Sequence, residues 1–192
     1  MILYLHGFKS SPQSFKARLL GTTLAAAGRS AEYCCPQLPA SPAQAMALAL
    51  RLVRGVPAAA LTLIGSSLGG YYATWLAERL GCRAVLLNPA VRAPRDLDQY
   101  VGVSSAYHSD QPFDFKPAYV DELRALAVPG ITRPSRYLLL AATGDEVLDW
   151  REMQAHYPLA RQIIIAGSDH GISDFADYID TVLAFCDAAP II

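Results

Sequence analysis

Charge is scarce in this sequence: Asp, Glu, Lys and Arg make up 17% of its 192 residues, and the formal net charge is −1. No run of Lys and Arg is present, which argues against nucleic acid as a partner. Long apolar runs are missing too, and those present are too short to span a bilayer. The length predicts one domain, residues 1–192, and the 53% of hydrophobic residues is ample for a large core.

The chain also lacks a cysteine framework. Its four cysteines form no C-x-x-C pair and show no metal-ligand spacing with histidine: Cys34, Cys35, Cys82 and Cys186. We expect small buried side chains in a reducing compartment, because the alternative, a catalytic cysteine, has no supporting context. The N-terminal residues show a strand pattern without a charged leader or cleavage site. These absences predict a cytoplasmic protein.

Short apolar runs alternate with helical stretches, which is typical of a parallel α/β sheet. The runs are continuous rather than alternating, as expected for strands covered on both faces. The predicted strands are Ile2 to Leu5, Ala31 to Cys35, Leu61 to Ile64, Ala84 to Leu87, Tyr137 to Ala141, and Gln162 to Ile165.

Helix-capping residues support the intervening helices. Ser11 is expected to cap the first, with Pro12 in its first turn, Gly28 just past its end and a buried stripe that includes Phe15 and Leu20. The others are predicted from Pro42 to Arg54 with Ser41 as cap, directly after Gly69, from Trp150 to His156, and from Asp174 to Asp187.

The strongest chemical pattern is Gly65-Ser66-Ser67-Leu68-Gly69, which reads G-x-S-x-G. It lies between an apolar strand and a helix, the context in which this pattern forms a nucleophile elbow. The tight turn exposes the Ser67 hydroxyl and directs the positive end of the next helix at the site. Ser67 is therefore the predicted nucleophile.

A serine hydroxyl needs a base, a group that orients the base, and donors for the oxyanion. Asp145 follows a predicted strand and is the expected acid, while its rival Asp149 looks more like a helix cap. His170 follows the last strand and is the expected base. The turn His6-Gly7-Phe8 ends the first strand, so the backbone N–H groups of Phe8 and Leu68 are the expected oxyanion donors.

With these motifs, the chain resembles the YqiA-like esterases, a bacterial family of small α/β-hydrolases. The matching stretches are Leu3 to Phe8, Ser10 to Pro12, Pro36 to Pro39, Gly65 to Leu76, Asn88 to Arg92, Thr143 to Asp149, and His170. The resemblance implies a three-layer α/β/α sandwich, a trimmed α/β-hydrolase fold with about six parallel strands in the order 2-1-3-4-5-6. It also implies Ser67, Asp145 and His170 as the catalytic triad.

The stretch from Pro89 to Pro134 breaks the regular alternation. It is rich in proline, shows no clear strand and contains one helical stretch, Ala118 to Ala127. Long irregular segments in compact domains are usually functional or mobile, so we expect a lid-like insertion at about residues 89–134. Its aromatic residues are candidates for an apolar substrate pocket, above all Tyr107, Phe113 and Phe115, with Tyr100 and Tyr119. The alternative is that they only attach the insertion to the domain.

The expected activity is that of a carboxylic ester hydrolase, acting through a Ser-His-Asp triad and an acyl-enzyme. The resemblance implies short acyl esters as substrates, with acyl-CoA thioesters as further candidates. No metal or organic cofactor is needed, and the expected partner is a small-molecule ester or thioester. A non-catalytic binding module on the same fold, or amide hydrolysis by the same triad, are the alternatives.

Overall fold

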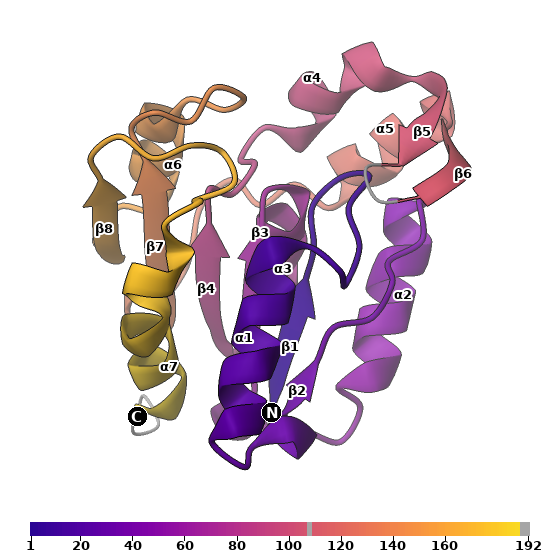
Figure 1. Ribbon diagram of the computed structural model, residues 1–192. Coiled ribbons are helices and arrows are strands. Elements are labelled where there is room, and N and C mark those ends of the chain that lie inside the picture. Colours follow the sequence, from indigo (N-terminus) through magenta and orange to yellow (C-terminus); the bar gives the residue numbers. More distant parts are fainter. Residues whose placement is uncertain (107–108, 189–192) are drawn as a thin grey trace.

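The computed structural model describes residues 1–106 and 109–188, without the side chains of residues 103–113. Six parallel strands form its central sheet (Figure 1): β1 (Ile2–Leu5), β2 (Tyr33–Cys34), β3 (Thr62–Ser66), β4 (Arg83–Leu87), β7 (Tyr137–Ala142) and β8 (Arg161–Ile165). Their order in the sheet is β2-β1-β3-β4-β7-β8. Numbered within this sheet, the order is 2-1-3-4-5-6, so the predicted fold class and strand order are confirmed.

Helices cover both faces of the sheet and complete the three layers (Figure 1). One face carries α1 (Phe15–Ala26) and α7 (Ile179–Asp187), and the other carries α2 (Pro42–Leu52), α3 (Leu68–Leu80) and α6 (Trp150–His156). In β1, Leu3 and Leu5 pack on the second face, while Ile2 and Tyr4 pack on the first. Because successive side chains point to opposite faces, a strand buried on both sides is apolar throughout.

Several helix caps lie where the sequence predicted them. Ser41 caps α2, and its Oγ accepts a hydrogen bond from the Gln44 N–H at 3.2 Å. Gly28 follows the end of α1 with a φ of 73°, a left-handed conformation that suits glycine. The predicted cap of α1 is wrong, because the helix begins at Phe15 after Ser14. Ser11 instead accepts the Gln13 N–H in the preceding turn.

Two predicted elements are shorter than expected. The second strand was expected from Ala31, but Ser30–Glu32 forms a 3-10 turn and leaves β2 with two residues. The last helix was expected from Asp174, but Phe175–Tyr178 is a 3-10 turn that precedes α7. Both differences lie at element ends, where competing local hydrogen bonds decide the boundary.

The expectation of no strand between Pro89 and Pro134 is wrong. This segment contains α4 (Ala93–Leu97), a 3-10 turn (Asp98–Tyr100), an antiparallel hairpin of β5 (Gly102–Ala106) and β6 (Ser109–Phe115), and α5 (Pro117–Ala125). The hairpin was hard to predict because its residues are largely polar and β6 contains Pro112, which removes a backbone donor. A strand with one partner tolerates such a proline, whereas a central strand does not.

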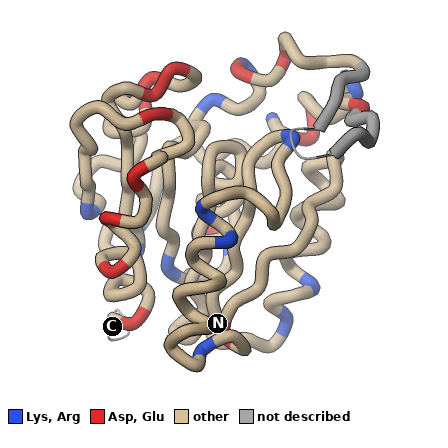
Figure 2. Tube along the Cα trace, viewed as in Figure 1, with Lys and Arg blue, Asp and Glu red and all other residues tan. Residues whose placement is uncertain are grey.

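Within residues 89–134, α4 and the strands β5 and β6 lie over the edge of the sheet where the parallel strands end (Figure 1). Because β1, β3, β4, β7 and β8 run parallel, the loops that follow them all emerge at this edge. Lys and Arg are scattered over the molecule in the view of Figure 2, without a continuous basic face. Among the described residues, no helix is both long and apolar enough to cross a membrane.

Candidate active site

Ser67 occupies a strained turn between β3 and α3. Its φ and ψ are 55° and −121°, a conformation that costs a non-glycine residue about 1–3 kcal/mol. Backbone hydrogen bonds maintain this geometry: the Ser67 N–H donates to the Leu87 carbonyl at 3.0 Å, and the Ser67 carbonyl accepts the Ala90 N–H at 3.0 Å. The structure therefore supports the turn from β4 and from the residues that follow it.

The glycines of the motif are required by close backbone contacts. A Cβ atom on Gly65 would overlap the carbonyl oxygen of Gly69, and one on Gly69 would overlap the carbonyl oxygen of Leu5. A Cβ atom on Gly7 would lie 3.2 Å from the Ser67 Cβ. The turn after β1 therefore lies directly against the predicted nucleophile.

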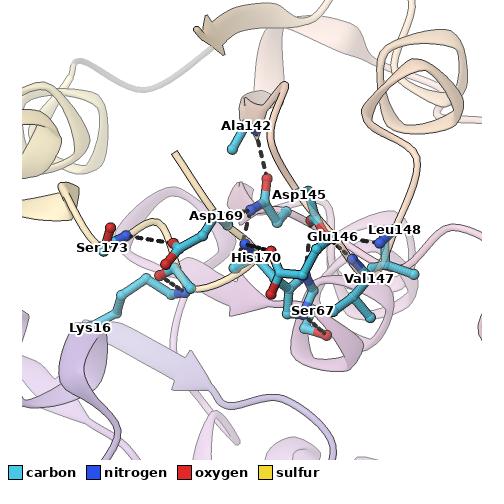
Figure 3. A network of polar contacts seen from close by, with 12 residues as sticks. Lys16, Ser67, Ala142, Asp145, Glu146, Val147, Leu148, Asp169, His170 and Ser173 are labelled. Atoms are coloured by element: carbon cyan, nitrogen blue, oxygen red, sulfur yellow. Dashed lines mark hydrogen bonds and ion pairs between the residues drawn. The ribbon is translucent and has the colours of Figure 1, made fainter. Parts of the chain in front are cut away.

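His170 connects Ser67 to Asp145 (Figure 3). Its Nε2 lies 3.0 Å from the Ser67 Oγ, and its Nδ1 lies 2.8 Å from Asp145 Oδ2. The Asp145 side chain is fully buried, and that of His170 is 21% exposed. This spacing matches a serine whose proton passes to an imidazole oriented by a carboxylate. The structure thus brings together the three residues that the sequence placed at separate strand ends.

The Asp145 carboxylate is fixed by the turn that contains it. Its Oδ1 accepts the backbone N–H groups of Val147 and Leu148, both at 2.8 Å. Asp149, the rival acid, instead caps α6 and accepts the Arg151 N–H at 2.9 Å, as predicted. The geometry therefore selects Asp145 as the partner of His170.

The turn after β1 carries the predicted oxyanion donor Phe8. His6 holds this turn in place: its Nε2 accepts the Leu38 N–H at 3.0 Å, so its Nδ1 bears the proton and donates to the Gly7 carbonyl at 3.0 Å. Burial lowers the pKa of His6. Leu68, the second predicted donor, is the first residue of α3, where helix geometry leaves N–H groups without intrahelical acceptors.

A cavity of about 710 Å³ opens above Ser67. Phe8, Leu68 and His170 line it together with Ser67, so the predicted nucleophile, base and oxyanion residues share one space. Its remaining lining comes from three places: the segment of residues 89–134 (Ala90, Leu97 and Tyr100), α1 (Phe15 and Lys16) and the loop of Asp145 (Glu146, Val147 and Leu148). Phe15 was expected in the core, but it is 54% exposed at this cavity.

The predicted pocket aromatics have different positions. Phe115 is fully buried and packs edge-to-face on Phe8, with ring centroids 5.1 Å apart, and it does not line the described cavity. Tyr100 does line it, 5.6 Å from the Phe8 ring. Tyr107 and the side chain of Phe113 lie outside the described residues. Phe115 therefore packs against the turn after β1, and Tyr100 lines the cavity itself.

Asn88 was part of a matching stretch in the sequence, but no role was predicted for it. It is fully buried after β4, and its side-chain amide donates to the carbonyls of Asp169 and His170 at 3.0 and 3.1 Å. Its Oδ1 accepts the Ala142 N–H at 2.8 Å, three residues before Asp145. One side chain thus joins the loop of His170 to the strand that precedes Asp145. A buried Asn at a strand end is the signal that could have revealed it.

Replacing Asn88 with alanine is expected to lower kcat by about 10-fold to 100-fold, because a small displacement of His170 relative to Ser67 is costly in catalysis. One buried and two partly buried backbone groups would also lose their hydrogen bonds, at about 1 kcal/mol each. The measurements are steady-state ester hydrolysis and the unfolding midpoint of the same preparations.

Thr143→Val is the matched control for Asn88. Thr143 Oγ1 accepts the Gly167 N–H at 2.8 Å, so it joins the same two loops without contacting Asp169 or His170. This variant is expected to change kcat by less than about threefold. A folded Asn88→Ala protein with wild-type kcat would show that Asn88 contributes stability alone.

Lys16 and Glu146 are two further charged residues of the cavity that the sequence reasoning missed. Lys16 is 8% exposed and donates from Nζ to the Gly171 carbonyl (Figure 3). Burial lowers its pKa to about 8, against the opposing influence of Asp169 and Asp145. Glu146 Oε2 accepts the backbone N–H of His170 at 2.9 Å. Lys16 precedes the buried Leu20 by one helical turn, so the period of α1 already indicated its burial.

Comparison with known proteins places this geometry in context. The sequence model of a protein family, described as "Uncharacterised protein family (UPF0227)", matches residues 1–187 of the chain. The structure is similar to an Agrobacterium vitis S4 protein with a provisional hydrolase name, at a TM-score of 0.77 and 19% identity over 97% of this chain and 87% of that one. It is also similar to mouse alpha/beta hydrolase domain-containing protein 10, at a TM-score of 0.70 and 16% identity over 95% and 88%.

A third similar structure is that of Est1E from Butyrivibrio proteoclasticus with ferulic acid bound. Its TM-score is 0.67, with 12% identity over 95% of this chain and 87% of that one. At these identities the likeness establishes the α/β-hydrolase fold. The family match over nearly the whole chain confirms the resemblance to the YqiA-like family.

Proposed function

The chain belongs to the Uncharacterised protein family (UPF0227), and from its site we propose that it is a serine hydrolase that cleaves carboxylic esters with short-to-medium acyl chains. The observation that carries this proposal is the continuous link from Ser67 Oγ through His170 to Asp145, at 3.0 and 2.8 Å. Ser67 lies on a strained strand-to-helix turn and lines a cavity large enough for a small ester.

In the proposed reaction, His170 Nε2 removes the proton of Ser67 as Oγ attacks the acyl carbon. Asp145 accepts the Nδ1 proton in a hydrogen bond and stabilises the imidazolium that forms. The bond to the alcohol oxygen then breaks, and that oxygen takes the proton from His170. Water, activated by His170 in the same way, hydrolyses the acyl-enzyme and releases the acid.

The N–H groups of Phe8 and Leu68 would stabilise the oxyanion of each tetrahedral intermediate. Two features support this role: both residues line the cavity beside Ser67, and Gly7 lets the turn after β1 approach it closely. Such donors typically contribute about 10²-fold to 10³-fold to kcat. The names of similar proteins support the substrate class, since one is an esterase domain from a Rhodothermus marinus protein and Est1E binds ferulic acid.

The test is hydrolysis of 4-nitrophenyl esters from acetate to dodecanoate, together with acyl-CoA thioesters of the same lengths. We expect turnover of the shorter esters and an acyl-enzyme adduct of Ser67 under single-turnover conditions. If the protein hydrolyses aryl amides but none of the esters, it is an amide hydrolase. Binding of esters without any turnover would indicate a non-catalytic module on this fold.

We further propose that the segment of residues 89–134 supplies the acyl pocket. Leu97 and Tyr100 of this segment, with Phe8, provide an apolar wall next to Ser67. Each methylene that this wall covers would add at most ~0.8 kcal/mol, about fourfold in kcat/KM. Tyr100→Ala is therefore expected to flatten the rise of kcat/KM with chain length in the ester series above.

Leu159→Ala provides the control for Tyr100, because Leu159 is an apolar side chain that is 90% exposed and does not line the described cavity. It should leave the chain-length profile unchanged. Phe115→Ala should lower kcat/KM by a similar factor for every chain length. It should also reduce the free energy of unfolding by about 3–5 kcal/mol, as for a fully buried aromatic residue. An unchanged profile in Tyr100→Ala would place the acyl chain elsewhere.

A further inference from the structure

The catalytic cavity has a buried positive charge on one wall. The Lys16 side chain starts in the first turn of α1 and extends to the loop of His170, where its ammonium donates to the Gly171 carbonyl (Figure 3). Lys16 and Gly171 both line the cavity that contains Ser67. The cavity thus has apolar lining at Leu97 and Tyr100, with the Lys9 ammonium 5.6 Å from the Tyr100 ring centroid, and a buried cation at Lys16.

The Lys16 ammonium has three N–H donors and is incompletely paired. Within the described part of the chain, the Gly171 carbonyl is its one hydrogen-bond acceptor. Asp169 and Asp145 act on Lys16 electrostatically, but their described hydrogen bonds come from other donors: Asp145 accepts from Val147, Leu148 and His170, and Asp169 accepts the Ser173 N–H. A buried charge is normally paired, so the remaining N–H donors of the ammonium could bind an anion that enters the cavity.

The first turn of α1 adds to the positive potential. Ser14 and Phe15 line the same cavity, and this 12-residue helix has neither a side-chain cap at Ser14 nor an acidic residue in its first turn. Its N-terminal end is thus not compensated by its own residues. Among the acidic residues of the cavity, Asp96 pairs with Arg95 at 2.7 Å, and Glu146 accepts the His170 N–H.

The position of Lys16 indicates which part of the substrate it contacts. The alcohol oxygen must lie beside His170 Nε2 to receive its proton. Lys16 is bonded to the residue that directly follows His170, whereas Phe8, Leu97 and Tyr100 form the apolar wall beside the oxyanion turn. The hydrogen bond of Lys16 to the residue that follows His170 therefore favours contact with the departing alcohol over contact with the acyl chain.

We propose that Lys16 binds an anionic group on the alcohol part of the substrate, so the preferred substrates are esters of an alcohol or phenol that bears a carboxylate or phosphate. This assignment rests on the proposed ester hydrolysis and names its substrate class. Charge-assisted hydrogen bonds of this type favour the anionic substrate by about 10-fold to 100-fold.

The experiment uses three acetyl esters that differ only at the far end of the phenol: 4-acetoxybenzoate, 4-acetoxyphenyl phosphate and the neutral 4-acetoxybenzamide. The quantity measured is kcat/KM for each anionic ester divided by kcat/KM for the neutral one. Comparison of this ratio between wild type and Lys16→Gln cancels differences in chemical reactivity. If the substitution also disturbs the loop of His170, kcat/KM falls by the same factor for all three esters, and the ratio does not change.

Lys16→Gln is expected to lower the ratio by about 10-fold or more for the preferred anion, while Lys16→Arg retains most of it. A larger loss with the benzoate indicates a carboxylate substrate, and a larger loss with the phosphate ester indicates a phosphorylated one. The matched control is Lys116→Gln, which removes an exposed positive charge before α5 and should leave the ratio unchanged.

An equal ratio in wild type and Lys16→Gln, with the three esters still hydrolysed, would overturn the anion site and leave the proposed hydrolase intact. If Lys16→Gln does not fold, inhibition of the wild-type enzyme decides the question. 4-Hydroxybenzoate should inhibit at least about 10-fold more strongly than 4-hydroxybenzamide. Equal inhibition by the two would overturn the proposal.

Discussion

Ser67→Ala is expected to reduce kcat for a short acyl ester by roughly 10⁴-fold to 10⁶-fold with the fold intact. The substitution removes the Oγ that lies 3.0 Å from His170 Nε2, and no covalent acyl-enzyme can form. Alanine fits the space that serine occupies, so the loss should appear in kcat rather than in the unfolding midpoint. The measurement is steady-state hydrolysis of 4-nitrophenyl acetate with circular dichroism of the same sample.

Ser66→Ala is the matched control. Ser66 is the last residue of β3 and also lines the cavity, but the contact with His170 belongs to its neighbour. Ser66→Ala should lower kcat far less than Ser67→Ala does. If Ser66→Ala is inactive and Ser67→Ala is active, the nucleophile is Ser66 and not Ser67.

Asp145→Asn should lower kcat by about 10⁴-fold, through the imidazole tautomer. The Val147 and Leu148 N–H groups both donate to Oδ1, so the oxygen of an asparagine would remain there and its NH₂ group would take the place of Oδ2, 2.8 Å from His170 Nδ1. Nδ1 would then become an acceptor and Nε2 would bear the proton. An imidazole in that tautomer cannot accept the Ser67 proton.

Asp149→Asn tests the rival acid in the same assay. Asn caps a helix about as well as Asp, so this change should leave both kcat and stability nearly unchanged. Both variants are isosteric with the wild type, which limits packing effects. The opposite ranking of the two variants would transfer the acid role to Asp149.

The sequence predicted the sheet well because its strands are buried on both faces. Runs such as Tyr137 to Ala141 have no polar interruption, and their turn residues mark where they end. The hairpin of β5 and β6 was missed for the opposite reason, since it has polar residues, a proline and one partner for each strand. Periodicity also misplaced Phe15, which belongs to the apolar pattern of α1 but lies at the cavity.

The meeting of Ser67, Asp145 and His170 could be predicted because parallel strands end at one edge of the sheet. Ser67, Asp145 and His170 each follow a strand, and the structure brings them within hydrogen-bond distance. Asn88 and Lys16 could not be assigned in this way, because their contacts join segments about 80 and 155 residues apart in sequence. Such contacts depend on how loops fold back over the sheet, which local pattern does not encode.

Labelling of the wild-type protein with a fluorophosphonate, followed by mass spectrometry of its peptides, tests directly whether Ser67 is an activated nucleophile. An activated serine reacts with this probe, whereas an ordinary hydroxyl does not. We predict one stoichiometric adduct on Ser67, strongly reduced in Asp145→Asn and absent in Ser67→Ala. A folded wild-type protein that remains unlabelled, or an adduct on another residue, would contradict the account.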